Sequence, residues 1–402
     1  MVLTEDIIRK DRRERGTDLG TVRVAYFLST RELAGERGGD EKLSATGDPA
    51  IDGPINASHR GNLPMVVERL RNYNRMAEAS GCGPRIEISL IVVDDVEVMR
   101  DFSDLGIPVH QEPSTYPDAR KTVTIERVKS CMSRRERELT QTDVEWREVI
   151  RRHKASAVAL AKDSYERRLL NQMEEHGIDI IISDRYMRIF GPTFLSQFLG
   201  LIINSHPAIL PEIPGNIPTS GALDRAARHG HMWTGITCHI IDEGEDTGPA
   251  ILQKENVRIM PEEIAGGVEN QARLRRRNYE NEGQVLASGL VQYLSDPRVM
   301  QLIRSRRQFV TANGNRGRIL ESMQELGRLI VNSYRETFDS FYPNHKDEKS
   351  RTVYHIPPER SIAGAGRYRY CFGRQAMRQS AKTAVYTPPR TPLRRTVTTG
   401  GC

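Results

Sequence analysis

Residues 204–253 read NSHPAILPEIPGNIPTSGALDRAARHGHMWTGITCHIIDEGEDTGPAILQ, and this stretch is the strongest chemical signal in the chain. An apolar, strand-like run ends at Asn204, and the prolines after His206 prevent the chain from continuing as a helix or strand. A second apolar segment alternates through His239 and then turns at glycines that flank Asp246. We therefore expect two strand ends that bring an amide, an imidazole and a carboxylate together.

Three motif blocks occur in order around this stretch. N-x-H-P-x-x-L-P-x-x-P-G begins at Asn204, D-x-G-P begins at Asp246, and IDIIISDRYMRIFGP at 178–192 precedes both. Together they resemble the formyltransferase family, above all its phosphoribosylglycinamide members, and the resemblance covers roughly residues 20–300.

The resemblance implies catalytic roles for Asn204, His206 and Asp246, which match the family's catalytic residues. Formyl transfer to an amine passes through a tetrahedral intermediate, so the site must stabilise an oxyanion and accept a proton. Asn204 can donate to the oxyanion and His206 can add a second donor. Asp246 can orient the imidazole or receive the proton of the amine. His239 either supports this site or is a hydrogen-bonded core histidine.

The donor that the resemblance implies is 10-formyltetrahydrofolate, bound as a cosubstrate without a metal. In the family, a Met-Arg-Ile segment and the loop that enters the catalytic Asp form the folate pocket, in which backbone groups pair with the pterin. The corresponding residues here are Met187, Arg188, Ile189, Phe190, Ile241, Asp242, Glu243, Gly244 and Glu245. Taken alone, Met187 and Ile189 are more typical of core positions, and only their place beside the motif favours binding.

The acceptor implied first is phosphoribosylglycinamide, whose phosphate the family holds in a glycine-containing loop after the first strand. In this chain an insertion splits that loop, and one glycine is missing. Glu282 falls where the family has a glutamate that contacts the amine substrate, with a surface glutamate as the alternative interpretation. The candidate acceptor-binding residues are Ser29, Thr30, Arg60, Gly61, Asn62 and Glu282.

The order of the expected elements predicts an α/β fold. Strand-type runs lie at 21–29, 86–95, 105–110 and 178–183, and helical spacing occurs at 61–81 and 157–177. Continuous apolar strands that alternate with helices favour a doubly wound, mostly parallel sheet covered on both faces. Ligands of such sheets bind beyond the carboxyl ends of the strands. Amphipathic segments near the end predict a helical C-terminal extension.

We expect four regions along the chain. They are a polar segment at 1–20, a catalytic domain at 21–300 with insertions near 30–58 and 111–153, a helical extension at 301–372 and a basic flexible tail at 373–402. The tail carries six basic side chains and no acid, which accounts for the net charge of +6 and leaves the rest nearly neutral. We therefore expect no nucleic-acid partner and interpret the tail as a disordered end, with nucleic-acid or membrane contact as the alternative.

Composition narrows the remaining possibilities. The five cysteines are scattered without metal-ligand spacing, so free thiols are expected rather than disulfides or a zinc site. No apolar run is long enough to span a bilayer, and MVLTEDIIRKDRRERG at the start lacks a secretory h-region, so we expect a cytoplasmic protein without a membrane partner. The sequence leaves the oligomeric state open.

The expected function is therefore formyl transfer from 10-formyltetrahydrofolate to a primary amine, with phosphoribosylglycinamide, a substrate of purine biosynthesis, as acceptor. Three alternatives remain open. The first is a specialised N-formyltransferase that acts on an amino sugar or natural-product amine, which the altered phosphate loop favours. The second is a formyltetrahydrofolate hydrolase, in which water replaces the amine. The third is a non-catalytic binding or scaffold protein, which the three intact motif residues argue against.

Overall fold

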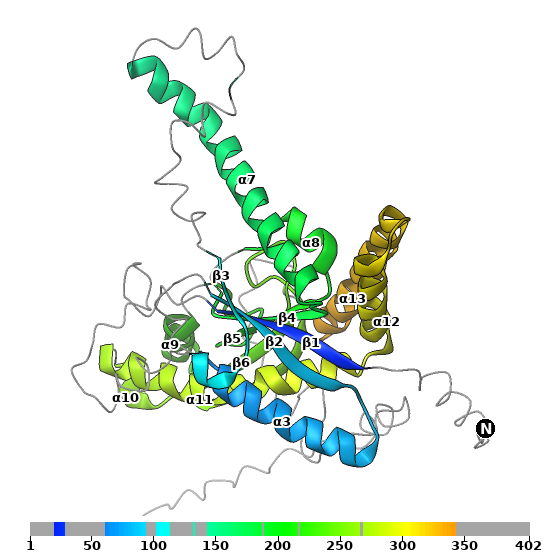
Figure 1. Cartoon of the computed structure of the whole chain (residues 1–402). Helices are drawn as coiled ribbons and strands as arrows, with labels where there is room; N and C mark the ends of the chain where they lie inside the picture. The colour runs from blue at the N-terminus through cyan, green and yellow to red at the C-terminus, as the bar shows by residue number, and fades with distance from the viewer. Residues whose placement is uncertain are drawn as a thin grey trace, which may run out of the picture.

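A seven-stranded sheet with the order β3-β2-β1-β4-β5-β6-β7 runs through the centre of the molecule (Figure 1). In this computed structural model the described residues are 20–28, 61–93, 102–112, 132, 143–186, 189–215, 218–265 and 268–342. The strands are β1 (Thr21–Leu28), β2 (Arg85–Val93), β3 (Val109–Gln111), β4 (Ile180–Asp184), β5 (Ile202–His206), β6 (Trp233–Ile240) and β7 (Ala250–Arg258).

Strands β1 to β5 pair in parallel, whereas β6 and β7 add an antiparallel edge. The parallel strands β1 and β4 lie at the centre, and β4 reads IIISD with every residue buried. Such uninterrupted burial is typical of a sheet covered on both faces. The predicted doubly wound, mostly parallel sheet is therefore confirmed, and the strand expected at 105–110 is present only as the short β3.

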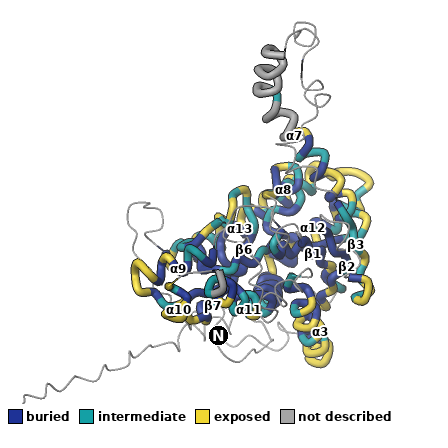
Figure 2. Tube along the Cα trace, turned by 90° about the vertical axis from the view of Figure 1, so that its left-hand side faces the viewer, coloured by how far each residue is buried: buried dark blue, intermediate teal, exposed yellow. Residues whose placement is uncertain are grey.

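Helices cover both faces of the sheet. They are α3 (Leu63–Ser80), α7 (Asp143–Glu175), α8 (Pro192–Phe198), α9 (Pro218–His229), α10 (Pro261–Ile264), α11 (Val268–Leu294), α12 (Pro297–Thr311) and α13 (Arg316–Phe341). Adjacent residues of β1 point to opposite faces: the Phe27 ring packs on Phe194 of α8, with centroids 6.1 Å apart, whereas Tyr26 reaches a carboxylate that also binds Asn62, just before α3. Figure 2 shows the buried residues concentrated in the strands and in the helix faces packed on them.

The C-terminal helices belong to the same core as the sheet. Buried side chains of α12 and α13, among them Ile303 and Ile330, join the main apolar cluster. The domain boundary expected at residue 300 falls inside α12, so the helical extension begins within that helix and packs against the catalytic region. Helix α7 begins at Asp143, which makes the end of the second expected insertion helical.

Several predicted regions lie outside the described residues. The polar N-terminal segment, the insertion at 30–58 and the basic tail at 373–402 are among them, as is most of the insertion at 111–153.

The β6–β7 pairing depends on a glycine. Gly235 lies at a register shift, where a Cβ would overlap the Lys254 carbonyl oxygen and approach the Glu255 Cα to 2.7 Å. Gly235→Ala should therefore lower the free energy of unfolding by about 2 kcal/mol or more, because backbone atoms cannot move aside as a flexible side chain can. Gly317→Ala is the matched control, since nothing lies within 4 Å of its added methyl. Equal unfolding midpoints in urea for the two variants would contradict this account.

Candidate active site

Strand β5 presents its functional side chains on two faces. The Ser205 hydroxyl donates to Glu282 of α11 at 2.8 Å, so Ser205 faces the α11 side of the sheet. Because side chains alternate along a strand, Asn204 and His206 face the opposite side. The antiparallel register places His239 of β6 directly opposite Asn204. Three of the polar residues of the motif stretch are thereby gathered on one face.

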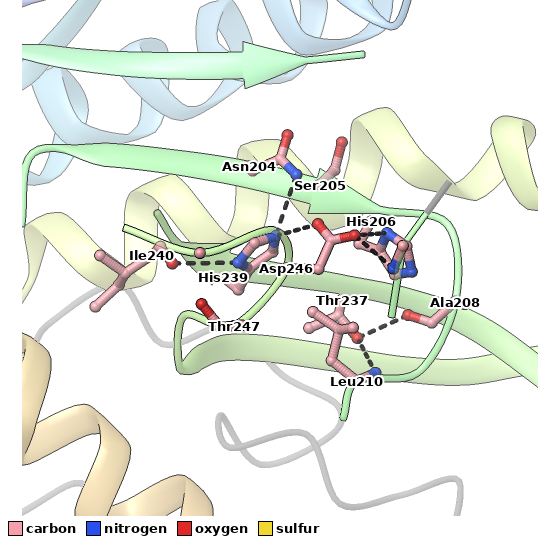
Figure 3. A network of polar contacts seen from close by, with 12 residues as sticks. Asn204, Ser205, His206, Ala208, Leu210, Thr237, His239, Ile240, Asp246 and Thr247 are labelled. Carbon is pink, nitrogen blue, oxygen red and sulfur yellow. Dashed lines mark hydrogen bonds and ion pairs between the residues drawn. The ribbon is translucent and has the colours of Figure 1, made fainter. Parts of the chain in front are cut away.

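The loop between β6 and β7 delivers the carboxylate of Asp246 (Figure 3). The antiparallel register sets Ile240, the last residue of β6, opposite Ile203, so the loop has to fold back to reach the end of β5. One carboxylate oxygen of Asp246 lies 3.2 Å from His206 Nδ1, and the other lies 3.6 Å from His239 Nε2. Two imidazoles therefore flank one carboxylate, as the motif predicted for His206.

A backbone amide and an unusual conformation fix Asp246 in this position. The Gly215 N–H donates to the carboxylate at 2.9 Å, which ties the loop to the segment after β5. Asp246 itself has φ 51°, a left-handed conformation that a residue with a short polar side chain tolerates better than most. The position of this carboxylate is thus set by contacts from outside its own loop.

Both ring nitrogens of His206 face oxygens that only accept hydrogen bonds. Nε2 lies 2.6 Å from the Ile213 carbonyl oxygen, and Nδ1 faces the Asp246 carboxylate. A neutral imidazole carries a single N–H, which the short contact assigns to Nε2. The Nδ1 lone pair then points at a carboxylate, so a proton arriving there would be shared between His206 and Asp246. The pair is therefore arranged to accept one proton.

Burial and neighbouring charges shift the pKa values of His206 and Asp246 in opposite directions. Burial lowers the pKa of His206, and the neighbouring Asp246 charge offsets this only in part. Burial alone raises the pKa of Asp246, but its interactions with His239 and His206 and the Gly215 N–H outweigh burial and lower the pKa. The net effect lowers the pKa of both His206 and Asp246.

Asn204 supplies the amide of the site. Its Nδ2 lies 3.1 Å from His239 Nε2, while His239 Nδ1 donates to the Ile240 carbonyl oxygen at 3.1 Å. An amide nitrogen carries two hydrogens, and His239 accepts one of them. The second hydrogen can be donated to an oxyanion. His239, which is 2% exposed, is therefore both a hydrogen-bonded core residue and a support of the site, so the two alternatives of the sequence coexist.

A second polar cluster, which we call the Asp184 cluster, lies on the α11 side of the sheet. It comprises Tyr26, Asn62, Asp184, Arg185, Ser205 and Glu282. Asp184, at the end of β4, accepts from the backbone N–H of Asn62 at 2.7 Å and from its side chain at 3.0 Å. Glu282 accepts from the Asn62 amide at 2.8 Å. A Cβ at Gly61 (φ 55°) would overlap the Asp184 carboxylate, which explains a glycine there.

Two carboxylates and one guanidinium share the buried Asp184 cluster. Burial, reinforced by the charge of Asp184, raises the pKa of Glu282 from its usual 4.5 to about 7, against the opposing charge of Arg185. Arg185 lies 3.8 Å from Glu282 and stacks over the Tyr279 ring, with its guanidinium carbon 3.8 Å from the ring centroid. Burial and the Asp184 carboxylate also raise the pKa of Tyr26. This cluster therefore carries no net positive charge.

The predicted folate residues fall into three groups. Met187 and Arg188 lie outside the described residues. Phe190 is 3% exposed and stacks on Phe194 with centroids 4.9 Å apart, so its side chain belongs to the core. Ile189 is 49% exposed, and the core interpretation of this residue was wrong. The loop residues Ile241, Asp242, Glu243, Gly244 and Glu245 are partly or fully exposed beside Asp246.

Only some of the predicted acceptor residues lie in the described part of the chain. Ser29, Thr30 and Arg60 lie outside the described residues, whereas Gly61 and Asn62 contact Asp184 at the start of α3. The alternative interpretation of Glu282 as a surface residue was wrong, because its side chain is fully buried. Structure thus joins Asn62 and Glu282 by a direct hydrogen bond, although 220 positions separate them in the chain.

Sequence reasoning missed Asp184 and Arg185. The signal that could have revealed them is their place in IDIIISDRY, where two charged residues end an apolar strand. A charge at the carboxyl end of a central parallel strand is costly unless paired, and the pairing partners come from α3 and α11. Within the described ranges, no group of three or more His, Cys, Asp or Glu could hold a metal ion. No helix in those ranges is both long enough and apolar enough to cross a membrane.

An amide, two imidazoles and a carboxylate at the edge of a mostly parallel sheet define an α/β domain suited to acyl-group transfer. Residues 119–286 match the family model described as formyl transferase. The segment contains Asn204, His206, Asp246 and Glu282.

Individual relatives match over a shorter stretch. A phosphoribosylglycinamide formyltransferase of Bacillus subtilis is 42% identical over 93 residues, which are 23% of this chain and 46% of that protein. The enzyme of the same name from Mycobacterium tuberculosis is 40% identical over 94 residues, 23% of this chain and 42% of that protein. The chain thus spans less than half the length of these curated relatives.

A solved structure of phosphoribosylglycinamide formyltransferase from Bacillus halodurans aligns with a TM-score of 0.39. Its identity is 23%, and the alignment covers 68% of this chain and 96% of that protein.

Glu282 should make stability depend on pH. Its folded-state pKa of about 7 lies above the usual 4.5, so its contribution favours folding below pH 4.5 and is lost as pH rises through 7. Glu282→Gln removes this titration and can keep both contacts, because the Ser205 hydroxyl can accept as well as donate. The variant should gain about 3 kcal/mol relative to wild type between pH 4.5 and 7, measured by urea unfolding across that range.

The control is Glu280→Gln, an exposed glutamate on the same helix, which should track wild type at every pH. A constant difference between wild type and Glu282→Gln from pH 4.5 to 8 would rule out a raised pKa for Glu282.

Proposed function

We propose that this chain transfers a formyl group from 10-formyltetrahydrofolate to a primary amine, with phosphoribosylglycinamide as the first acceptor. The observation that carries the proposal is the Asp246 carboxylate, held between His206 and His239 beside the Asn204 amide. These residues lie inside the segment that matches the formyl transferase model. Because the chain spans only part of its curated relatives, this activity of the whole protein is a proposal.

The geometry suits each step of the transfer. The amine nitrogen attacks the formyl carbon, and the carbonyl oxygen becomes an oxyanion that the second hydrogen of Asn204 Nδ2 can stabilise. The attacking nitrogen then loses its proton to the His206–Asp246 pair, which shares it across 3.2 Å. Collapse breaks the bond between the formyl carbon and N10 of the folate, and N10 takes up the proton that the His206–Asp246 pair had received. His206 already faces oxygens at both nitrogens, so in this arrangement Asn204 is the oxyanion donor.

Exposed residues in the two predicted folate segments fit a folate. Ile189 is half exposed and can pack against a pterin ring, while Ile241 is partly exposed at the start of the loop that carries Asp246. The backbone of residues 241–245 can pair with the donors and acceptors of the pterin. Asp242 already accepts from the Gly244 N–H at 3.1 Å, so the loop keeps a defined shape before a ligand arrives. The folate itself supplies the activated formyl group.

The Asp184 cluster favours a second candidate acceptor, an amine without a phosphate. The Asn62 backbone N–H, which precedes α3 and would be available to an anion, donates to the Asp184 carboxylate instead. Among the described residues, a phosphate placed there would meet a buried carboxylate and no excess positive charge. Two features support phosphoribosylglycinamide instead: the phosphoribosylglycinamide formyltransferases among the relatives and the position of Glu282.

Asp246→Asn should abolish formyl transfer without unfolding the protein. Asparagine adopts a left-handed conformation as readily as aspartate, so the φ of 51° is preserved, whereas the proton acceptor is lost. We expect the turnover number to fall by a factor of about 10² to 10⁴, measured from tetrahydrofolate release. Asp224→Asn on α9 is the control, because that carboxylate is 67% exposed. Unchanged turnover in Asp246→Asn would remove Asp246 from the mechanism.

The acceptor is assigned by measuring tetrahydrofolate release with phosphoribosylglycinamide, with a panel of non-phosphorylated amines including amino sugars, and without amine. Release that depends on phosphoribosylglycinamide would support the first acceptor. Release with another amine alone would support the second candidate, in line with the carboxylate at Asn62. Release without amine would replace both with a hydrolase, and folate binding without release would replace them with a non-catalytic binding protein.

A further inference from the structure

Helix α13 contacts the loop that carries Asp246. Arg335 donates from Nη2 to the Asp242 carboxylate at 2.5 Å and from Nη1 to the Thr247 carbonyl oxygen at 3.2 Å. Its two anchor points lie on either side of Asp246 in the chain, so one guanidinium holds both ends of the segment that delivers the carboxylate. Helix α13 lies beyond the matched family segment, which ends at residue 286.

The anchor residue Asp242 also organises the loop internally. Its Oδ1 accepts from the Gly244 N–H at 3.1 Å and from the Thr247 hydroxyl at 2.5 Å, while Oδ2 binds Arg335. One carboxylate thus closes residues 242–247 into a ring of contacts that connects to α13 through Arg335.

The end of α13 reaches the other segment of the site as well. Phe338 and Tyr342 pack with Leu210 in a small buried cluster. The Tyr342 hydroxyl donates to Gln253 Oε1 at 3.1 Å, and Gln253 Nε2 donates to the Leu210 carbonyl oxygen at 2.5 Å. Leu210 belongs to the segment that supplies the Ile213 carbonyl oxygen to His206. Both segments that touch the His206–Asp246 pair are therefore supported by the same helix.

The exposure of the ion pair indicates a local role. Arg335 is 39% exposed and Asp242 is 15% exposed, and pairs this close to solvent contribute little to global stability. Asp246, in contrast, has a left-handed backbone, which is held only where surrounding contacts fix it. The Arg335 contacts lie where they can fix it, on both sides of that residue.

We propose that Arg335 is a positioning residue for formyl transfer, which holds the Asp242–Thr247 loop so that Asp246 meets His206 and the loop backbone is preformed for the folate. The proposal rests on the proposed function for its catalytic consequence. Its structural part, the ordering of the loop by α13, is independent of which acceptor is used.

The test compares Arg335→Met, Arg335→Lys and the control Arg328→Met in the full-length chain. Arg328 is exposed on the same helix two turns earlier, and nothing in the described part of the chain links it to the loop. Two readouts are taken: hydrogen–deuterium exchange of peptides covering residues 241–249, and kcat and KM for 10-formyltetrahydrofolate with the acceptor that supports turnover.

In Arg335→Met we expect roughly tenfold faster exchange in the loop, a roughly tenfold lower kcat and a higher KM for the folate, at an unchanged melting temperature. Arg335→Lys should bring loop exchange, kcat and KM most of the way back to their wild-type values, because an ammonium can still bind Asp242. Arg328→Met should match wild type. If Arg335 had only a general structural role, Arg335→Met would lower the melting temperature. Arg335→Lys would then restore kcat only as far as it restored the melting temperature.

Three outcomes would overturn the proposal. They are unchanged exchange in Arg335→Met, faster exchange with unchanged kcat and KM, or equal effects in Arg328→Met. If the wild type shows no turnover with any amine or with water, the proposed function fails. The exchange experiment then still decides whether Arg335 orders the loop.

Discussion

The two-residue period of β5 is the constraint on which both polar sites depend. Because Ser205 points to one face and Asn204 and His206 to the other, a single five-residue strand supplies side chains to two chemically distinct clusters. A slip of one residue in its pairing with β4 or β6 would exchange the two faces and destroy both. The buried central strands, which tolerate no polar residue without a partner, enforce this register.

The two clusters differ in how far neighbouring groups offset the burial of their carboxylates. At Asp246 the contacts with His239, His206 and the Gly215 N–H together outweigh desolvation and lower the pKa of the carboxyl. At Glu282 the compensation is incomplete, because Asp184 adds a like charge, and the pKa rises to about 7. The first arrangement suits proton acceptance during group transfer. The second joins the start of α3 with β4, β5 and α11 at the carboxyl ends of the parallel strands.

Helices α12 and α13 lie outside the segment that matches the family model, yet they pack against it. Helix α12 is built into the main apolar core, and α13 continues from it across the sheet to the segments around the active site. The α13 contacts are polar at Arg335 and apolar at Phe338, so the helix both packs on the domain and reaches its functional loop. A helical extension of this kind contacts the candidate active site, although nothing in its own sequence carries a catalytic motif.

Apolar runs and turn residues are local signals, so the sequence alone was enough to predict the parallel sheet. Motif spacing can likewise be recognised without coordinates, and it singled out Asn204, His206 and Asp246 as candidates, which the structure brings together. The sequence could not determine the antiparallel edge, the opposition of His239 and Asn204, or the burial of Glu282. Those features arise from pairings between distant segments: Asn62 meets Glu282 across 220 positions, and Arg335 meets Asp242 across 93. No local pattern encodes such contacts, since each depends on how the sheet and helices pack together.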